Sequence, residues 1–205
     1  KARAQFAEGQ HAASEKSLNS AAALAVDDPY MLASLGSEWI AQGRSDHGLD
    51  LLGHWIHTHS VKPDVDVLLR YGDLLASAKR EGELKSWLAN IGKIPGLTPN
   101  QQKRLEDQGL RQVLRATDLA LADEDYEQAD KLLNQASPEY RADPRWLLEP
   151  VDVRRYQGRY TEARALLASI LAKRPDDFEA RLALARVLEQ SGAHGKALAV
   201  VRDVV

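Results

Sequence analysis

The sequence has no cysteine, a single methionine and only two phenylalanines among its 205 residues. The absence of cysteine excludes disulfides, thiolate chemistry and cysteine-ligated metal, and it suits an oxidising compartment. No apolar run is long enough to span a bilayer, so we expect no membrane insertion by this chain. Nucleophile-elbow, Walker and dinucleotide-binding motifs are also missing. We therefore expect a protein that is not an enzyme and that has no cofactor.

An excess of basic residues is missing as well. Lys and Arg number 27 against 30 Asp and Glu, which gives a net charge of −3, whereas nucleic-acid-binding proteins usually carry a clear basic excess. We therefore expect no nucleic-acid partner. What the sequence does contain is abundant alanine and leucine with few valines and isoleucines, and this composition favours helix over sheet.

A fixed spacing marks the C-terminal half of the chain. Tyr160 and Ala163 begin an apolar helical stripe that closes on Pro175, and Ala129 and Ala197 lie 34 residues before and after Ala163. A constant period of this length is the signature of an array of helical repeats. In the N-terminal half, the same spacing separates Gly9 from Gly43 and Pro29 from Pro63.

The middle of the chain departs from this spacing. A third unit, about 64–91, is shifted by two residues, and the segment IGKIPGLTP that follows it holds two Gly and two Pro, which predicts a loop. Thr98 and Pro99 are typical of a helix start, and we expect a helix from there to about residue 122, in a unit with 11 extra residues. The predicted organisation is an N-terminal block (1–91), a joint (92–98) that lets the two halves change relative orientation, and a C-terminal block (99–205).

Gly36, Pro150 and the two ends of the chain lead to three further structural predictions. Gly36 is placed where a neighbouring helix would need close approach. Pro150 falls inside the expected first helix of the fifth unit, where it should kink that helix or move its start towards Val151. The chain begins at Lys1 without Met and ends inside an apolar helical pattern, so we expect a fragment of a longer array.

These residues resemble the tetratricopeptide repeat, a family of 34-residue antiparallel helix pairs with conserved small and aromatic positions. The segments that match the repeat pattern are Leu35-Gly36-x2-Trp39…Gly48-x3-Leu52 and Tyr160-x2-Ala163-x3-Leu167-x2-Ile170-x4-Pro175. Ser14 and Leu84 depart from the pattern at the small-residue position. The resemblance implies an all-α fold, an open right-handed superhelix of helix pairs with an irregular joint in the middle.

A narrower resemblance concerns the order of the segments. A degenerate array, the spacer GLTPNQQ, a long helix, the junction ASPEYRADPRW and then regular repeats are similar to the periplasmic repeat region of the BcsC-like proteins of bacterial cellulose synthase. That resemblance implies a periplasmic, non-enzymatic scaffold that binds other members of an exopolysaccharide export complex next to an outer-membrane protein, with polysaccharide as a further candidate partner. Two alternatives stay open, namely a cytoplasmic adaptor that captures a peptide and a substrate-recruiting arm of an enzyme whose catalytic domain lies elsewhere.

The tetratricopeptide resemblance also implies where a partner binds. Ligands of that family commonly lie on the concave surface lined by the first helix of each repeat. This surface would carry charges of both signs, which suits a peptide or another polar ligand better than DNA. The alternative for each residue is a solvated side chain or an ion pair within the array. The corresponding positions are Arg111, Asp118, Arg145, Asp152, Arg155, Tyr156, Glu179, Arg186 and Glu189.

Three other groups of residues are weaker candidates for chemistry. His54, His57 and His59, with His47 upstream, contain a metal-ligand residue type, but no carboxylate follows at ligand spacing, and a face of exposed histidines is the simpler interpretation. The acidic run 123–125 lacks the alternating ligands of a calcium loop, and we expect Asp125 to begin a helix. Most of the tryptophans share faces with Leu and Ile and are expected in the core, whereas Trp146 is expected to open a helix beside Arg145. We therefore predict no metal site and no catalytic residues.

Overall fold

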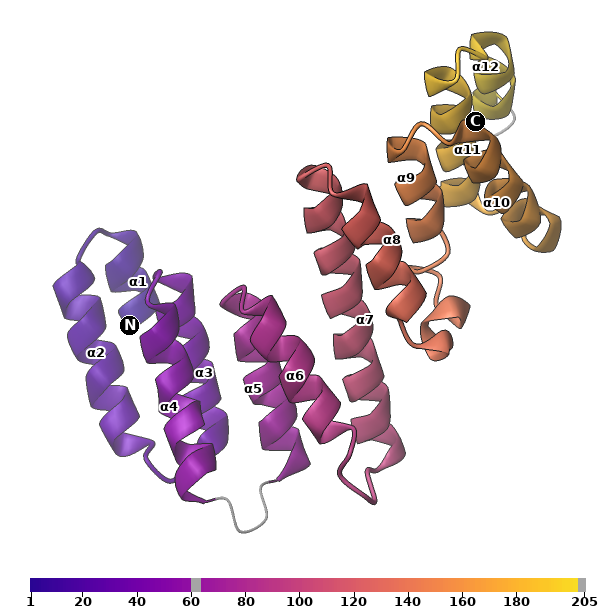
Figure 1. Cartoon of the computed structure of the whole chain (residues 1–205). Coiled ribbons are helices and arrows are strands. Elements are labelled where there is room, and N and C mark those ends of the chain that lie inside the picture. The colour runs from indigo at the N-terminus through magenta and orange to yellow at the C-terminus, as the bar shows by residue number, and fades with distance from the viewer. Residues whose placement is uncertain (60–63, 203–205) are drawn as a thin grey trace. The chain divides into compact units, whose positions relative to one another are not determined.

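The computed structural model describes residues 1–59 and 64–202, and within them the chain is helical with no strand (Figure 1). Pro63 and residues 203–205 lie outside the described residues. The all-α prediction is confirmed. In chain order the elements are α1 (Ala2–Ala7), α2 (His11–Leu24), α3 (Pro29–Ala41), α4 (Ser45–Thr58), α5 (Val65–Ser77), α6 (Glu81–Ile91), α7 (Pro99–Ala122), α8 (Tyr126–Gln135), the 3₁₀ turn η1 (Pro138–Ala142), α9 (Glu149–Tyr156), α10 (Tyr160–Lys173), α11 (Phe178–Gln190) and α12 (His194–Arg202).

The chain divides into two compact units, 1–112 and 113–205. In each, consecutive helices form antiparallel pairs, and apolar side chains between neighbouring pairs make the core. Leu52 and Leu75 are buried in the first unit, and Leu167 and Val187 are buried in the second. A helix pair cannot bury its apolar stripe alone, so each pair depends on its neighbour.

The long helix is correctly predicted from the sequence, including both of its ends. Helix α6 ends at Ile91 and α7 begins at Pro99, with Thr98 and Gln101 forming a capping box in which each side chain bonds the other's backbone N–H, at 3.1 and 3.3 Å. Helix α7 has 24 residues and α5 has 13, so α7 is longer by 11.

The boundary between the compact units falls inside α7, and the loop 92–98 belongs to the first unit. A movable joint at 92–98 stays a prediction.

One backbone position has left-handed conformation in every helix pair, two residues before the second helix. Glycine adopts this conformation freely, whereas a residue with a Cβ pays a steric cost. Lys79 and Glu124, both at φ 59°, occupy the position where the other pairs have glycine. The full set is Gly9, Gly43, Lys79, Glu124, Gly158 and Gly192, and it shows the two-residue shift and the 11-residue excess directly in the backbone.

We predict that Lys79→Gly and Glu124→Gly each stabilise the chain by about 0.5–1 kcal/mol, because relief of the left-handed strain exceeds the added entropy of the unfolded chain. Gly158→Ala, at φ 71°, should cost about 1 kcal/mol. Urea unfolding of the three variants measures both effects. A loss of stability in Lys79→Gly as large as that in Gly158→Ala would contradict the steric argument.

In the first two pairs the two helices meet at small, buried residues. In the second pair a Cβ built on Gly36 would lie 2.5 Å from the carbonyl oxygen of Gly48, and a Cβ on Gly48 would lie 2.5 Å from that of Gly36. The predicted close approach at Gly36 is therefore confirmed. Ser14 fills the equivalent position in the first pair, fully buried, and its hydroxyl donates to the carbonyl oxygen of Ala2 at 2.9 Å.

We predict that Gly48→Ala costs about 2–4 kcal/mol, because the new methyl group collides with backbone that can only yield by separating α3 from α4. Gly82→Ala is the matched control, since a Cβ there meets nothing within 4 Å and alanine favours the helix by up to about 1 kcal/mol. Urea midpoints should fall for the first variant and stay or rise for the second. Equal responses would show that the contact is not limiting.

Candidate functional site: the surface of the first helices

In the first unit, polar side chains of the first helices mostly bind one another. Asp66 on α5 accepts hydrogen bonds from Gln101 at 3.1 Å and Arg104 at 2.6 Å on α7. Gln108 is buried and donates to the carbonyl oxygen of Leu69 at 2.8 Å and to Asp73 at 2.6 Å. Predicted site residue Arg111 joins this network through Asp107 and, at 3.8 Å, Asp73. Its guanidinium therefore takes part in ion pairs within the array.

In the second unit, three predicted residues come together on α9. Arg155 donates to Asp152 at 2.8 and 2.9 Å, and its guanidinium carbon lies 4.2 Å from the centre of the Tyr156 ring. It also reaches Gln190 on α11 at 3.4 Å. The Arg155 side chain is only 13% exposed, whereas Tyr156 is 51% exposed. The arginine thus fixes the positions of its neighbours, and the tyrosine is open to a ligand.

Glu149 completes an acidic group with Asp118 and Asp152, and the sequence analysis missed it. Burial, followed by the nearby charges of Asp118 and Asp152, raises the pKa of Glu149 to about 7. Burial and the Asp152 charge also raise the pKa of Asp118. The signal in the sequence is weak, since Glu149 precedes Pro150 and looks like an ordinary first-turn carboxylate.

Three predicted residues on α11 have no partner within the described residues. Glu179, Arg186 and Glu189 are exposed, and no hydrogen bond or ion pair of theirs is found there. Glu179 and Arg186 are seven residues apart, so they lie on one face of the helix. This face offers charges of both signs that the array does not use internally.

Arg145 and Trp146 do not open a helix, which corrects the prediction. Helix α9 begins at Glu149 with Pro150 in its first turn, because a proline ring inside a longer helix would clash with the carbonyl oxygen four residues back. Arg145 lies in the preceding turn, where it donates to Asp143 at 2.9 Å and lowers the pKa of that carboxyl. Trp146 is 7% exposed and belongs to the core. The expected start near Val151 is close to the observed one.

Other candidate positions have structural explanations. Asp125 caps α8 by accepting the Gln128 N–H at 3.0 Å, as predicted. The described residues contain no group of three or more His, Cys, Asp or Glu that could hold a metal. His47, His54 and His59 line a common pocket, and His57 does not. None of the described helices combines the length and apolarity needed to cross a membrane.

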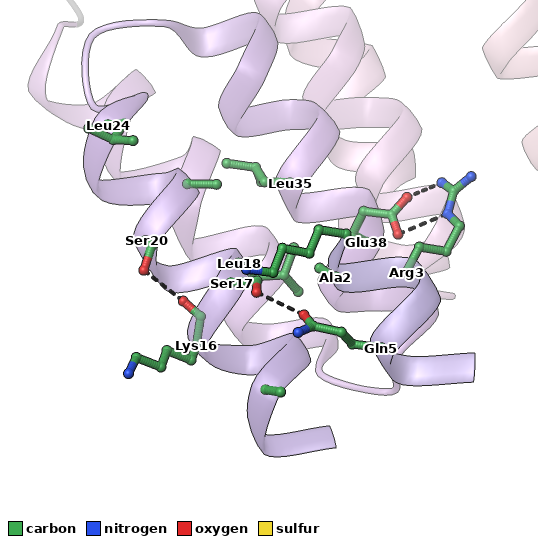
Figure 2. A pocket seen from close by; sticks show the side chains of 13 residues that line it. Ala2, Arg3, Gln5, Lys16, Ser17, Leu18, Ser20, Leu24, Leu35 and Glu38 are labelled. Atoms are coloured by element: carbon green, nitrogen blue, oxygen red, sulfur yellow. Dashed lines mark hydrogen bonds and ion pairs between the residues drawn. The ribbon is translucent and has the colours of Figure 1, made fainter. Parts of the chain in front are cut away.

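A hollow of about 900 Å³ lies between α1, α2 and α3. Figure 2 shows its polar edge, where Ser17 donates to Gln5 at 2.8 Å and Arg3 pairs with Glu38. Leu24 and Leu35 form part of its apolar wall. Four of its polar side chains thus pair with one another, as in the α5–α7 network.

Comparison with known proteins defines the class of this fold. Residues 155–205 match the tetratricopeptide repeat family. The C-terminal part of a TPR repeat-containing protein from Cytophaga hutchinsonii aligns with a TM-score of 0.62 at 13% identity, over 99% of this chain and 77% of that one. A tetratricopeptide repeat protein from Parabacteroides merdae aligns with a TM-score of 0.53 at 16% identity, over 99% and 75%. The tetratricopeptide resemblance is confirmed, with the family match itself confined to residues 155–205. Repeats of this family generally mediate protein–protein interactions, and the fold is typically that of a non-catalytic scaffold.

One relative carries a more particular name. The sequence is 26% identical over 179 residues to the protein called cellulose synthase operon protein C in Xanthomonas axonopodis pv. citri (strain 306). The match covers 87% of this chain and 9% of that protein. The chain therefore spans less than a tenth of the relative's length.

We predict that Glu149→Gln changes how stability depends on pH. The pKa of Glu149 rises from 4.5 in the unfolded chain to about 7 in the folded one, so the folded state binds an extra proton in this range, and its stability falls as pH rises from 4.5 to 7. Glu149→Gln should be more stable than the unmodified chain by about 1–2 kcal/mol at pH 8, after screening by solvent, and equal to it near pH 4.5.

Urea unfolding at pH 5 and pH 8 measures this difference. Glu189→Gln is the control, because it makes the same Glu-to-Gln change at an exposed position on α11. A pH profile of Glu149→Gln parallel to that of the unmodified chain would contradict the prediction.

Proposed function

We propose that this chain is a periplasmic, non-enzymatic, protein-binding scaffold of a bacterial cellulose or exopolysaccharide synthesis and export complex, attached in the full protein to an outer-membrane component. The name of the Xanthomonas relative supports the link to cellulose, and the helical array supports the scaffold role. The partners are other proteins of the complex, and polysaccharide is a further candidate.

The binding surface proposed for such a partner is the first-helix face of α9 and α11, together with Asp118 on α7. The observation that carries it is the set of exposed charges of both signs on α11, Glu179, Arg186 and Glu189, together with the exposed ring of Tyr156 on α9. In contrast, the polar side chains of α5 and the N-terminal part of α7 already bind each other. A partner segment with acidic and basic residues would complement the open charges, and charge complementarity of this kind sets specificity and association rate.

Arg186→Glu tests the surface better than a change at Arg155, because Arg155 holds Asp152 and its loss would also disturb the fold. In cells that make cellulose, we predict that deletion of the gene abolishes secreted cellulose and that the unmodified gene restores it. A gene with Arg186→Glu and Glu179→Lys should restore less, and cross-linking should recover the other proteins of the synthesis complex at least about fivefold less well.

Lys173→Glu is the matched control, since it reverses an exposed charge at the end of α10, away from the first-helix face. Cellulose is quantified as acid-insoluble glucose, and the location of the protein by fractionation. Normal cellulose after deletion, or a cytoplasmic protein, would refute the cellulose assignment. Normal cellulose and normal partner recovery with the α11 variants would refute the binding surface alone.

A further inference from the structure

A second pocket lies on the other side of the first unit, between the second helices of two neighbouring pairs. It encloses about 350 Å³ and is lined by one stripe of α4, the end of α2 and a single residue of α3. This volume is within the range of small-ligand pockets. The first-helix surface is lined by α3, α5 and α7 in this unit, so the pocket is a separate feature.

The walls of the pocket are mainly apolar. The lining includes the buried Leu32 of α3, Leu51 and Trp55 of α4, and Val26, which is 62% exposed. A mainly apolar hollow of this size with a few polar groups at its rim has the usual composition of a binding pocket. The pocket therefore favours an apolar group over a sugar, whose hydroxyls need many polar partners.

The aromatic part of the wall is held in place before any ligand arrives. The rings of Trp55 and His59 stack with centres 4.5 Å apart and planes 10° apart. A hydrogen bond of 3.0 Å joins the His59 Nδ1 to the carbonyl oxygen of Trp55. Little side-chain freedom is left to lose at this wall, which lowers the entropic cost of binding.

The rim of the pocket is acidic. Asp27 and Asp50 are exposed and have no hydrogen-bond or ion-pair partner within the described residues, and none of the described residues that line the pocket is Lys or Arg. The 900 Å³ hollow between α1, α2 and α3 differs, since it has Lys1, Arg3 and Lys16 in its lining. A cation next to an apolar group would therefore be complementary to the α2–α4 pocket.

We propose that this pocket binds an apolar side chain of about leucine or phenylalanine size that is flanked by lysine or arginine on a partner polypeptide. The apolar side chain fills the space beside Leu51 and Trp55, and its basic neighbours meet Asp27 and Asp50. A buried apolar anchor within a polar rim is the usual arrangement of an energetically dominant contact. The site is independent of the surface on α9 and α11, so either can fail without the other.

The test is a titration of the ¹⁵N-labelled chain with the blocked peptide acetyl-Gly-Lys-Phe-Lys-Gly-amide, followed by NMR. We expect saturable shifts at the amides of Asp50, His54 and Trp55 and at the Trp55 indole N–H. The peptides with Glu-Phe-Glu or Lys-Ala-Lys at the centre should bind at least about tenfold more weakly, because each loses one of the two complementary features. Equal binding of the three peptides, or no shift at these positions, would overturn the proposal.

Two variants and one control locate the site. Asp50→Lys reverses a rim charge and should weaken binding about tenfold. Ala22→Leu should abolish binding, because the larger side chain fills the pocket, and leucine still favours the helix. Asp123→Lys changes the net charge equally at an exposed position in the second unit and should leave binding unchanged. Circular dichroism verifies that each variant is folded. Unchanged binding in both pocket variants, or the same shifts produced by raising the concentration of the chain alone, would refute a partner peptide as the occupant.

Discussion

The close approach of two helices at a small residue is the contact on which the rest of the array depends, with Leu84 in the third pair as the exception. In the second pair it brings the backbones of Gly36 and Gly48 so near that neither residue can carry a Cβ. Ala129 and Ala163 are fully buried at the corresponding place in later pairs. Because the helices meet there, their apolar stripes face the next pair, and stacking of pairs buries the core. The small residue thus sets the distance between the two helices of a pair, and this distance determines how the pairs stack to form the core.

This dependence explains why the fold could be predicted from the sequence. A residue whose size is set by backbone contact recurs at the repeat period, and so does the glycine that turns the chain into the second helix. The third and fourth pairs were harder to place, because Lys79 and Glu124 occupy the left-handed position where glycine is expected. Nothing in their side chains indicates that conformation. The capping residues Thr98 and Asp125 were predictable because a cap is a local interaction.

The candidate site was less predictable, because its properties come from pairings between helices. Arg111 and Arg186 look alike in the sequence, yet Arg111 lies in an ion-pair network and Arg186 is open. Glu149 was missed because its pKa depends on burial and on two carboxylates 31 residues before and 3 residues after it. Arg145 was placed on a helix by the repeat spacing, and Pro150 prevents that helix. Spacing gives the position of a residue in the repeat, but not its electrostatic surroundings.

The division between paired and open charges also indicates how such an array can acquire a partner without loss of stability. Side chains that join α5 to α7 are needed for packing, since removing one member leaves another buried group without its hydrogen bond. Glu179 and Arg186, like Asp27 and Asp50, take part in no such pairing within the described residues. Substitution at those positions changes the surface that a partner meets while the helix contacts remain. Recognition can therefore vary on α11 and around the α2–α4 pocket, whereas the α5–α7 contact is constrained by the fold.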